Sequence, residues 1–153
     1  MTKSTPPFRF LPIIDYLCMP NGLPNGLYMI VIRNKYLPFP GFSAVNLFGV
    51  LFCRPGTRLT PRLINHERIH TAQMREMAFI FFYIWYLVEW TIRLACRGNA
   101  YFNISFEREA YRNEHNRKYL KQRKHYAWWK YTRDMTGPPM KRKRHQQSKH
   151  INQ

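Results

Sequence analysis

Two histidines and a glutamate stand at helical spacing in the string His66-Glu67-Arg68-Ile69-His70. Residues i and i+4 share one face of an α-helix, about one turn apart, so two imidazoles placed there can hold one Zn²⁺ ion. Glu67 between them can act as a base toward a water molecule that the metal activates. The chain has only eight acidic residues against 25 Lys+Arg, which makes a carboxylate at this position conspicuous.

A catalytic zinc site takes three protein ligands and leaves one position open. His66 and His70 supply two, and the third has to come from another element. The string at residues 106–110, Phe-Glu-Arg-Glu-Ala, offers Glu107 and Glu109 on a second predicted helix. Both lie within one turn, so spacing alone leaves the choice open. The alternative is that the histidines are ordinary surface or core residues and that the glutamates only complement the dipole of a helix start.

Together these strings resemble the gluzincin metallopeptidases. The match consists of HExxH, Gln73 as the last residue of HExxHxxQ, and Glu-x-Glu-Ala at residues 107–110, and it covers about residues 60–115. In particular, the chain resembles the small minimal gluzincins and the HtpX-like and CAAX-processing membrane endopeptidases.

The resemblance assigns roles to the residues of both strings. It implies one zinc ion held by three side chains, those of His66, His70 and Glu107. It implies that Glu67 is the general base in the hydrolysis of a peptide or protein substrate, and that Ala110 is the small residue that lets the glutamate helix approach the HExxH helix. Tyr111 stands where the family usually has Asp, so the chain departs from the pattern at the residue that would hydrogen-bond a zinc-binding histidine.

Peptide hydrolysis also needs a hydrogen-bond donor for the developing oxyanion. The candidates lie near Glu107 on the same predicted helix: Tyr111, Arg112 and His115. Tyr111 and His115 are alternatively residues that support the ligands. Glu114, at i+7 from Glu107, is interpreted as a solvated helix acid. Asn65 and Gln73 either hydrogen-bond near the site or lie on the surface.

The region 13–58 is predicted to form a small sheet. Tyr28–Arg33 is rich in β-branched residues, and Ser43–Phe52 is apolar on both faces, so each is a strand candidate. Gly49 inside the second run indicates a bulge or a close backbone approach. The resemblance places a substrate-aligning edge strand in this part of the chain, and Phe42–Phe52 is the candidate for it.

A helix is predicted to start at Thr60, which can cap it, with Pro61 at the first helical position. Neither Gly nor Pro follows until Gly98, so the helical pattern runs over 60–97. This is about 55 Å at 1.5 Å per residue, too long for one element of a domain of this size. We therefore expect a break near residues 74–78, or a helix that projects from the body.

A further helix is predicted from Ile104 to Lys124, capped by Asn103 or Ser105. It carries acids in its first turn and bases in its last, as the helix dipole favours. After it, Trp128, Trp129 and Tyr131 are predicted to form a docking segment. The predicted fold class is α+β, mainly α: a small sheet or hairpin, the HExxH helix, a long aromatic-rich helix and the glutamate-bearing helix.

The aromatic-rich helix raises the question of a membrane. Met77–Val88 is an apolar run without a charge, and Glu89 and Arg93 behind it can pair at i,i+4. A membrane span needs about 20 apolar residues, which favours a buried or interfacial helix. If the pair is tolerated, Met77–Cys96 would just cross a bilayer.

The net charge of +17 predicts anionic partners, and 13 of the 25 basic residues lie in residues 112–153. We expect one domain over residues 1–135, with residues 1–12 irregular, and a disordered basic tail over 136–153. The three cysteines contain no CxxC pair and are interpreted as buried, reduced thiols, which suits a cytoplasmic compartment. No signal peptide is expected, and membrane association would run through residues 77–96.

Two further hypotheses compete with the zinc peptidase. One is a non-catalytic protein of the same fold that binds zinc structurally or not at all. The other is a basic protein that binds nucleic acid or a membrane surface through its C-terminal third. The tail has little aromatic interleaving, so nucleic acid is not expected as the main partner.

Overall fold

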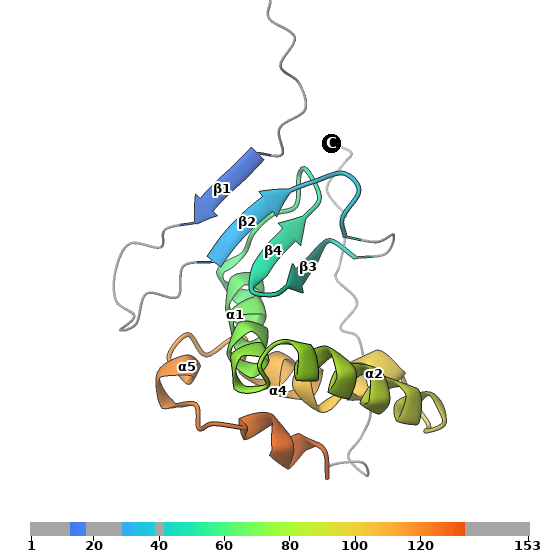
Figure 1. Ribbon diagram of the computed structural model, residues 1–153. Coiled ribbons are helices and arrows are strands. Elements are labelled where there is room, and N and C mark those ends of the chain that lie inside the picture. The colour runs from blue at the N-terminus through green and yellow to red at the C-terminus, as the bar shows by residue number, and fades with distance from the viewer. Residues whose placement is uncertain (1–12, 18–28, 39–41, 134–153) are drawn as a thin grey trace, which may run out of the picture.

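The computed structural model describes residues 13–17, 29–38 and 42–133, the first of these by its backbone. A small N-terminal sheet is followed by helices, so the fold is α+β and mainly α, as predicted (Figure 1). The predictions for residues 1–12, for Cys18 and for the tail 136–153 lie outside the described residues.

The sheet has four strands in the order β1-β2-β4-β3. The strands are β1 (Ile13–Leu17), β2 (Met29–Arg33), β3 (Ala44–Leu47) and β4 (Val50–Cys53). β2 and β4 run parallel, whereas the pairs β1–β2 and β3–β4 are antiparallel. Val31, Leu51 and Cys53 are fully buried on one face of the central strands. β3 forms one edge of the sheet and has a neighbouring strand on one side only.

The single strand predicted over Ser43–Phe52 is wrong, because this run is the hairpin β3–β4. Phe48 and Gly49 form its two-residue turn with φ of 52° and 85°, the left-handed conformation that suits a tight hairpin. Asn46 supports the turn, since its side-chain Oδ1 accepts a hydrogen bond from the Gly49 backbone N at 3.0 Å. The usual sequence signature of such a turn is Asn-Gly. Here Phe48 precedes Gly49 inside an apolar run, so the sequence does not indicate the turn.

The predicted break in the long helical run is confirmed. α1 (Pro61–Glu76) begins as expected, with Thr60 Oγ1 accepting from the Leu63 backbone N. α2 (Ile80–Leu94) follows at an angle of 109°. The chain turns through Ala78 and Phe79, whose φ values of 46° and 58° no helix tolerates. α2 ends at Leu94, before Arg97 and Gly98.

The helix predicted over Ile104–Lys124 is wrong in its extent. In this range the chain instead forms two short helices, α4 (Ser105–Asn113) and α5 (Tyr119–Gln122). A one-turn helix, α3 (Ala100–Asn103), precedes them, and the 3-10 helix η1 (Ala127–Tyr131) follows. Asn65 on α1 holds the break after α4 open, because its Nδ2 donates to the backbone carbonyls of Asn113, Glu114 and Asn116. Neither predicted cap is used, since Ile104 precedes α4 and makes no side-chain cap.

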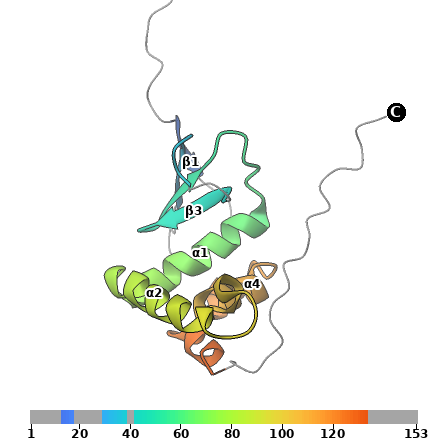
Figure 2. The same ribbon diagram turned by 90° about the vertical axis from the view of Figure 1, so that its right-hand side faces the viewer.

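α1 lies between the sheet and the remaining helices, as the two views show (Figures 1 and 2). Its C-terminal half joins α2, α4 and η1 around an apolar cluster formed by Met74, Phe82, Ile104, Phe106 and Trp128. The predicted docking is confirmed for Trp128 and Tyr131, which are buried, but not for Trp129, which is 49% exposed. α1 is therefore held from both sides.

Two predictions about single residues have different outcomes. Glu89 and Arg93 on α2 pair as expected, with Arg93 Nη2 donating to Glu89 Oε1 at 3.0 Å. Cys53 is buried, but Cys96 is exposed, because α2 ends before it and it lies outside the core.

Among the described residues, no single helix has the length and apolarity to cross a bilayer; α1 and α2 reach that threshold only when taken together as a bent pair.

Candidate metal centre

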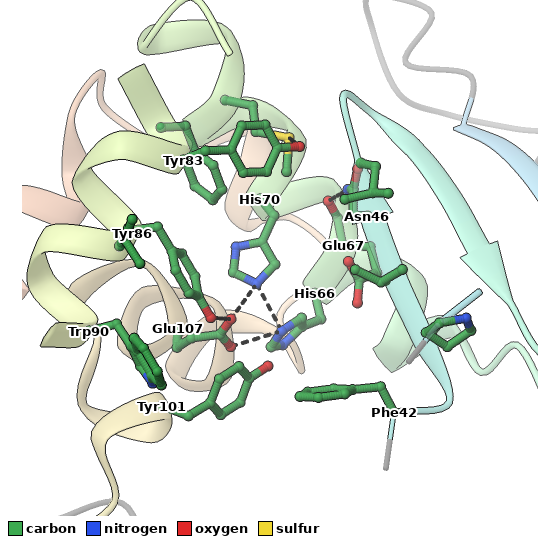
Figure 3. Close-up of a pocket in the computed structure, with 17 residues that line it drawn as sticks. Phe42, Asn46, His66, Glu67, His70, Tyr83, Tyr86, Trp90, Tyr101 and Glu107 are labelled. Atoms are coloured by element: carbon green, nitrogen blue, oxygen red, sulfur yellow. Dashed lines mark hydrogen bonds and ion pairs between the residues drawn. The ribbon is translucent and has the colours of Figure 1, made fainter. Parts of the chain in front are cut away.

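Three buried side chains from two helices converge on one point. The histidines of α1 face each other, with His66 Nε2 and His70 Nε2 at 3.1 Å. Glu107 on α4 approaches both, with carboxylate oxygens 3.5 Å from His66 Nε2 and 3.5 Å from His70 Nε2 (Figure 3). One ligand atom from each of the three residues lies within 4.8 Å of the others, so the group could hold a metal ion. We call it the His66–His70–Glu107 cage.

The spacing of the cage suits a tetrahedral metal. Ligand bonds of about 2.0–2.1 Å at tetrahedral angles place neighbouring ligand atoms about 3.3 Å apart. The two Nε2 atoms are 3.1 Å apart, and each lies 3.5 Å from one oxygen of Glu107, Oε2 for His66 and Oε1 for His70, so the separations lie on either side of that value. The donor set of two imidazoles and one carboxylate is the set that zinc takes in hydrolytic sites.

One atom of the cage supports a bound cation directly. Glu107 Oε2 is a buried carboxylate oxygen for which the described residues supply no hydrogen-bond donor. Its other oxygen, Oε1, accepts from the Tyr86 hydroxyl at 3.1 Å. Burying a charged oxygen without a hydrogen bond is costly, and a metal ion coordinated there would remove that cost.

Glu114 is a partner of the cage, and its interpretation as a solvated acid is wrong. Its side chain is 5% exposed, and Oε2 lies 3.0 Å from His66 Nδ1. Arg62 pairs with the other oxygen, with Arg62 Nε donating to Oε1 at 2.7 Å. A carboxylate on Nδ1 holds the proton on that nitrogen and directs Nε2 toward the cage. Glu114 therefore supplies His66 with the carboxylate partner that the sequence does not offer at position 111.

Gln73 orients the second histidine, His70, in the same way as Glu114 orients His66. His70 Nδ1 lies 2.8 Å from Gln73 Oε1, so an N–H there donates to the amide oxygen. Gln73 is fully buried, and its Nε2 donates to Glu109 Oε2 and to the Phe106 carbonyl. The orientation of His70 is thus tied to the backbone of α4.

Glu109, the alternative ligand, lies away from the cage. Its Oε1 accepts from the Tyr119 hydroxyl at 2.8 Å and from Arg123 Nε at 2.6 Å. Arg123 also pairs with Glu76 at the end of α1. Glu109 faces this ion pair because it lies two residues beyond Glu107, about 200° around the helix.

The electrostatics of the cage favour a cation. Burial opposes a charge on His66, but the carboxylates of Glu107 and Glu114 outweigh it and raise its pKa to about 10. His70 follows the same pattern: burial again opposes the charge, and the carboxylate of Glu107 raises the pKa. Burial disfavours the charge of Glu107, but the imidazoles of His70 and His66 hold its pKa well below the ordinary range. Two protons do not fit between Nε2 atoms that are 3.1 Å apart. A metal ion bound to both nitrogens and to Glu107 would therefore balance the buried carboxylate better than a proton does.

Glu67 lies beside the cage and lines the same pocket. It is 7% exposed, and burial raises the pKa of its carboxyl. Asn46 of β3 fixes the turn of α1 that carries it, since Asn46 Nδ2 donates to the Glu67 carbonyl at 2.8 Å and to Thr71 Oγ1 at 3.0 Å. The edge strand and the turn of α1 that carries Glu67 are therefore held in register.

The cage and Glu67 form one wall of a pocket of about 460 Å³. Most of its lining is apolar: Pro38, Phe42, Ala44, Val45, Leu47, Met74, Phe82, Leu87 and Trp90. Asn46, Tyr83, Tyr86 and Tyr101 add polar groups. Figure 3 shows Tyr101 and Tyr86 with their hydroxyls turned toward the cage, while β3 closes the opposite side. A few polar groups in an apolar concavity are typical of a ligand site.

The remaining candidates on α4 are placed differently. The Tyr111 ring packs edge-on against His66, with ring centroids 4.6 Å apart, and does not line the pocket. Arg112 is exposed and outside the pocket lining too. The His115 side chain is 64% exposed and lies on the outer side of Glu114, so it is not placed to reach a substrate in the pocket.

The sequence did not identify Tyr86 and Tyr101 as candidate site residues. Tyr86 lies in an apolar run where an aromatic residue gives no sign of chemistry, and Tyr101 lies between two predicted helices. Burial and the charge of Glu107 raise the pKa of both phenols above the ordinary value, so both stay protonated.

Comparison with family models, with curated proteins and with solved structures gave no match to this chain.

Proposed function

We propose that this protein is a zinc-dependent peptidase of gluzincin type. The proposal rests on one observation above all: the His66–His70–Glu107 cage, with Glu67 beside it, forms the wall of an apolar pocket. A purely structural metal site has no use for an open pocket or for a buried carboxylate next to its ligands.

The three cage residues would hold the ion, with Glu114 and Gln73 fixing the imidazoles behind them. When bound there, zinc supplies a Lewis acid that makes water nucleophilic at neutral pH and polarises a carbonyl group. The rest of the chemistry belongs to the residues of the chain.

Glu67 is the general base. It takes the proton from the attacking water and returns it to the leaving amine as the C–N bond breaks. Its buried position supports this role, because burial raises the pKa of its carboxyl and so makes the carboxylate a stronger base toward the attacking water. The hydrogen bond from Asn46 to its backbone keeps the carboxylate in place without occupying it.

Tyr101 is the donor for the developing oxyanion. Its raised pKa keeps its proton, and its hydroxyl hydrogen-bonds with that of Tyr111. Its hydroxyl is turned toward the cage (Figure 3), so with substrate bound it would give up its hydrogen bond to Tyr111 and donate to the substrate oxygen. Tyr86 is less suited because its hydroxyl already donates to Glu107.

An extended peptide is the substrate that the pocket fits best. β3 is an edge strand whose residues, from Ala44 to Leu47, line the pocket. A peptide can add to such an edge through main-chain hydrogen bonds while its side chains enter pockets. The aromatic and aliphatic lining favours apolar side chains next to the cleaved bond.

The test uses purified full-length protein loaded with zinc and a set of quenched fluorescent peptides. Wild type should cleave peptides with apolar residues, and Glu67→Gln should keep zinc while losing activity by about 10²–10⁴-fold. Arg75→Gln, an exposed substitution on the same helix, is the control and should leave activity unchanged. Zinc-loaded wild type that cleaves no peptide would favour the non-catalytic alternative. Equal activity of Glu67→Gln would overturn the assignment of the base.

A further inference from the structure

The solvent-facing side of α2 carries no charge. The helix has two charged residues, Glu89 and Arg93, and both are buried against each other. Glu89 also accepts from the backbone N and the hydroxyl of Ser105, which ties it to the start of α4. Seven of the outward positions are apolar and 47–63% exposed: Ile80, Phe81, Ile84, Leu87, Val88, Ile92 and Leu94. Thr91 lies exposed among them, with its hydroxyl donating to the Leu87 carbonyl of the same helix. A surface helix of a soluble domain normally shows the opposite distribution. We call these seven residues the apolar face of α2.

The apolar face continues onto neighbouring elements. Trp129 of η1 is 49% exposed and lies against Trp85 of α2, with ring centroids 5.8 Å apart. At the other side, Leu87 and Trp90 are exposed and also line the pocket. Figure 1 shows α2 running outward along one side of the molecule, away from the end of α1. A contiguous apolar surface of this kind marks an interaction site.

The charges of the described surface identify the sign of the partner. All six carboxylate side chains in residues 29–38 and 42–133 are buried. The exposed basic residues in the same ranges are Lys35, Arg58, Arg62, Arg75, Arg97, Arg112, Arg117, Lys118, Lys121, Lys124, Lys130 and Arg133. This part of the protein therefore presents cations without surface carboxylates. Lys130 follows Trp129, and Arg97 follows the end of α2, so cations flank the apolar face.

We propose that α2 docks in the plane of an anionic lipid bilayer, with its apolar face among the acyl chains and the flanking cations on lipid phosphates. An interfacial helix combines these two features. At 1.5 Å per residue, α2 is roughly 22 Å long, shorter than the hydrocarbon core of about 30 Å, so it suits the interface and not a span.

Other occupants fit less well. Nucleic acid would use the cations, but an aliphatic helix face offers its bases no stacking surface. A second copy of the chain would bring two positive surfaces together. Leu87 and Trp90 belong both to the exposed surface and to the pocket lining. Docking of α2 would therefore place the pocket next to the lipid headgroups. The docking itself does not depend on the proposed peptidase activity.

The experiment is co-sedimentation of the full-length protein with phosphatidylcholine vesicles, with and without phosphatidylglycerol. We expect binding to the anionic vesicles that weakens as salt is raised. The double variant Ile84→Ser/Val88→Ser changes no charge and should bind at least about tenfold more weakly, since two apolar side chains no longer enter the lipid. Tyr36→Ser, an exposed aromatic residue outside α2, is the control and should bind within about twofold of wild type.

Two results would overturn the proposal. One is absence of binding to anionic vesicles. If sedimentation velocity then shows a dimer that the double variant dissociates, the apolar face binds a second copy of the chain instead of lipid. The other is binding by the double variant within twofold of wild type, which would mean that charge alone is responsible. Circular dichroism of each variant establishes that it is folded, which is expected because both replaced side chains are about half exposed.

Discussion

Removing the carboxylate behind His66 should weaken metal binding without removing a ligand. In Glu114→Ala, His66 Nδ1 loses its acceptor at 3.0 Å. The side chains of His66 and Glu114 are 7% and 5% exposed, so water cannot readily replace the lost bond. Loss of such a partner typically lowers metal affinity about 10–100-fold, or about 1.4–2.7 kcal/mol. Glu114→Gln keeps an acceptor oxygen and should fall between Glu114→Ala and wild type.

The assay is competition for zinc between the protein and a chromophoric chelator at neutral pH. Arg62→Gln is the matched control, because it removes the other partner of Glu114. The Arg62 side chain is 46% exposed, and a pair of this kind contributes at most about 1 kcal/mol, so affinity should change no more than about fivefold. If Glu114→Ala binds zinc as tightly as Arg62→Gln, the carboxylate does not orient His66 and the reasoning fails.

Three further predictions concern the donor, the hairpin and the metal. Tyr101→Phe should lower kcat about 10²–10³-fold with little change in zinc affinity, as expected for a lost oxyanion donor; an unchanged kcat would rule Tyr101 out. Gly49→Ala should destabilise the fold by about 1 kcal/mol in chemical unfolding, because φ of 85° is strained for any residue with a Cβ; equal stability would mean that the hairpin turn rearranges. Removal of zinc by a chelator should lower the unfolding free energy by about 2.7 kcal/mol relative to protein in zinc at 100 times Kd; a Tm independent of zinc would contradict a folded-state site.

The pairing of His66 and His70 on α1 could be predicted because it depends only on local helix geometry. Thr60 and Pro61 define the start of the helix, and i,i+4 spacing then fixes which side chains share a face. Glu107 followed from the chemistry of zinc and the resemblance, not from spacing, since Glu109 is as close in sequence. Only the packing of α4, with Glu109 turned toward Arg123, separates the two.

The parts that could not be predicted depend on contacts between distant residues. Glu114 became a partner of His66 across 48 residues of chain. The helix expected over residues 104–124 stops because Asn65, on another helix, hydrogen-bonds carbonyls that helix continuation would use. The apolar run at 43–52 has the composition of one strand, and only the pairing of β3 with β4 shows the turn. Propensity cannot anticipate such long-range partners.

The most direct test of the metal centre is a crystal structure of the protein grown with zinc, with anomalous data collected above and below the zinc absorption edge. We predict one anomalous peak about 2.0–2.2 Å from His66 Nε2, His70 Nε2 and a carboxylate oxygen of Glu107. A zinc peak held by other residues, or an ordered cage without a peak while zinc is in excess, would contradict the account.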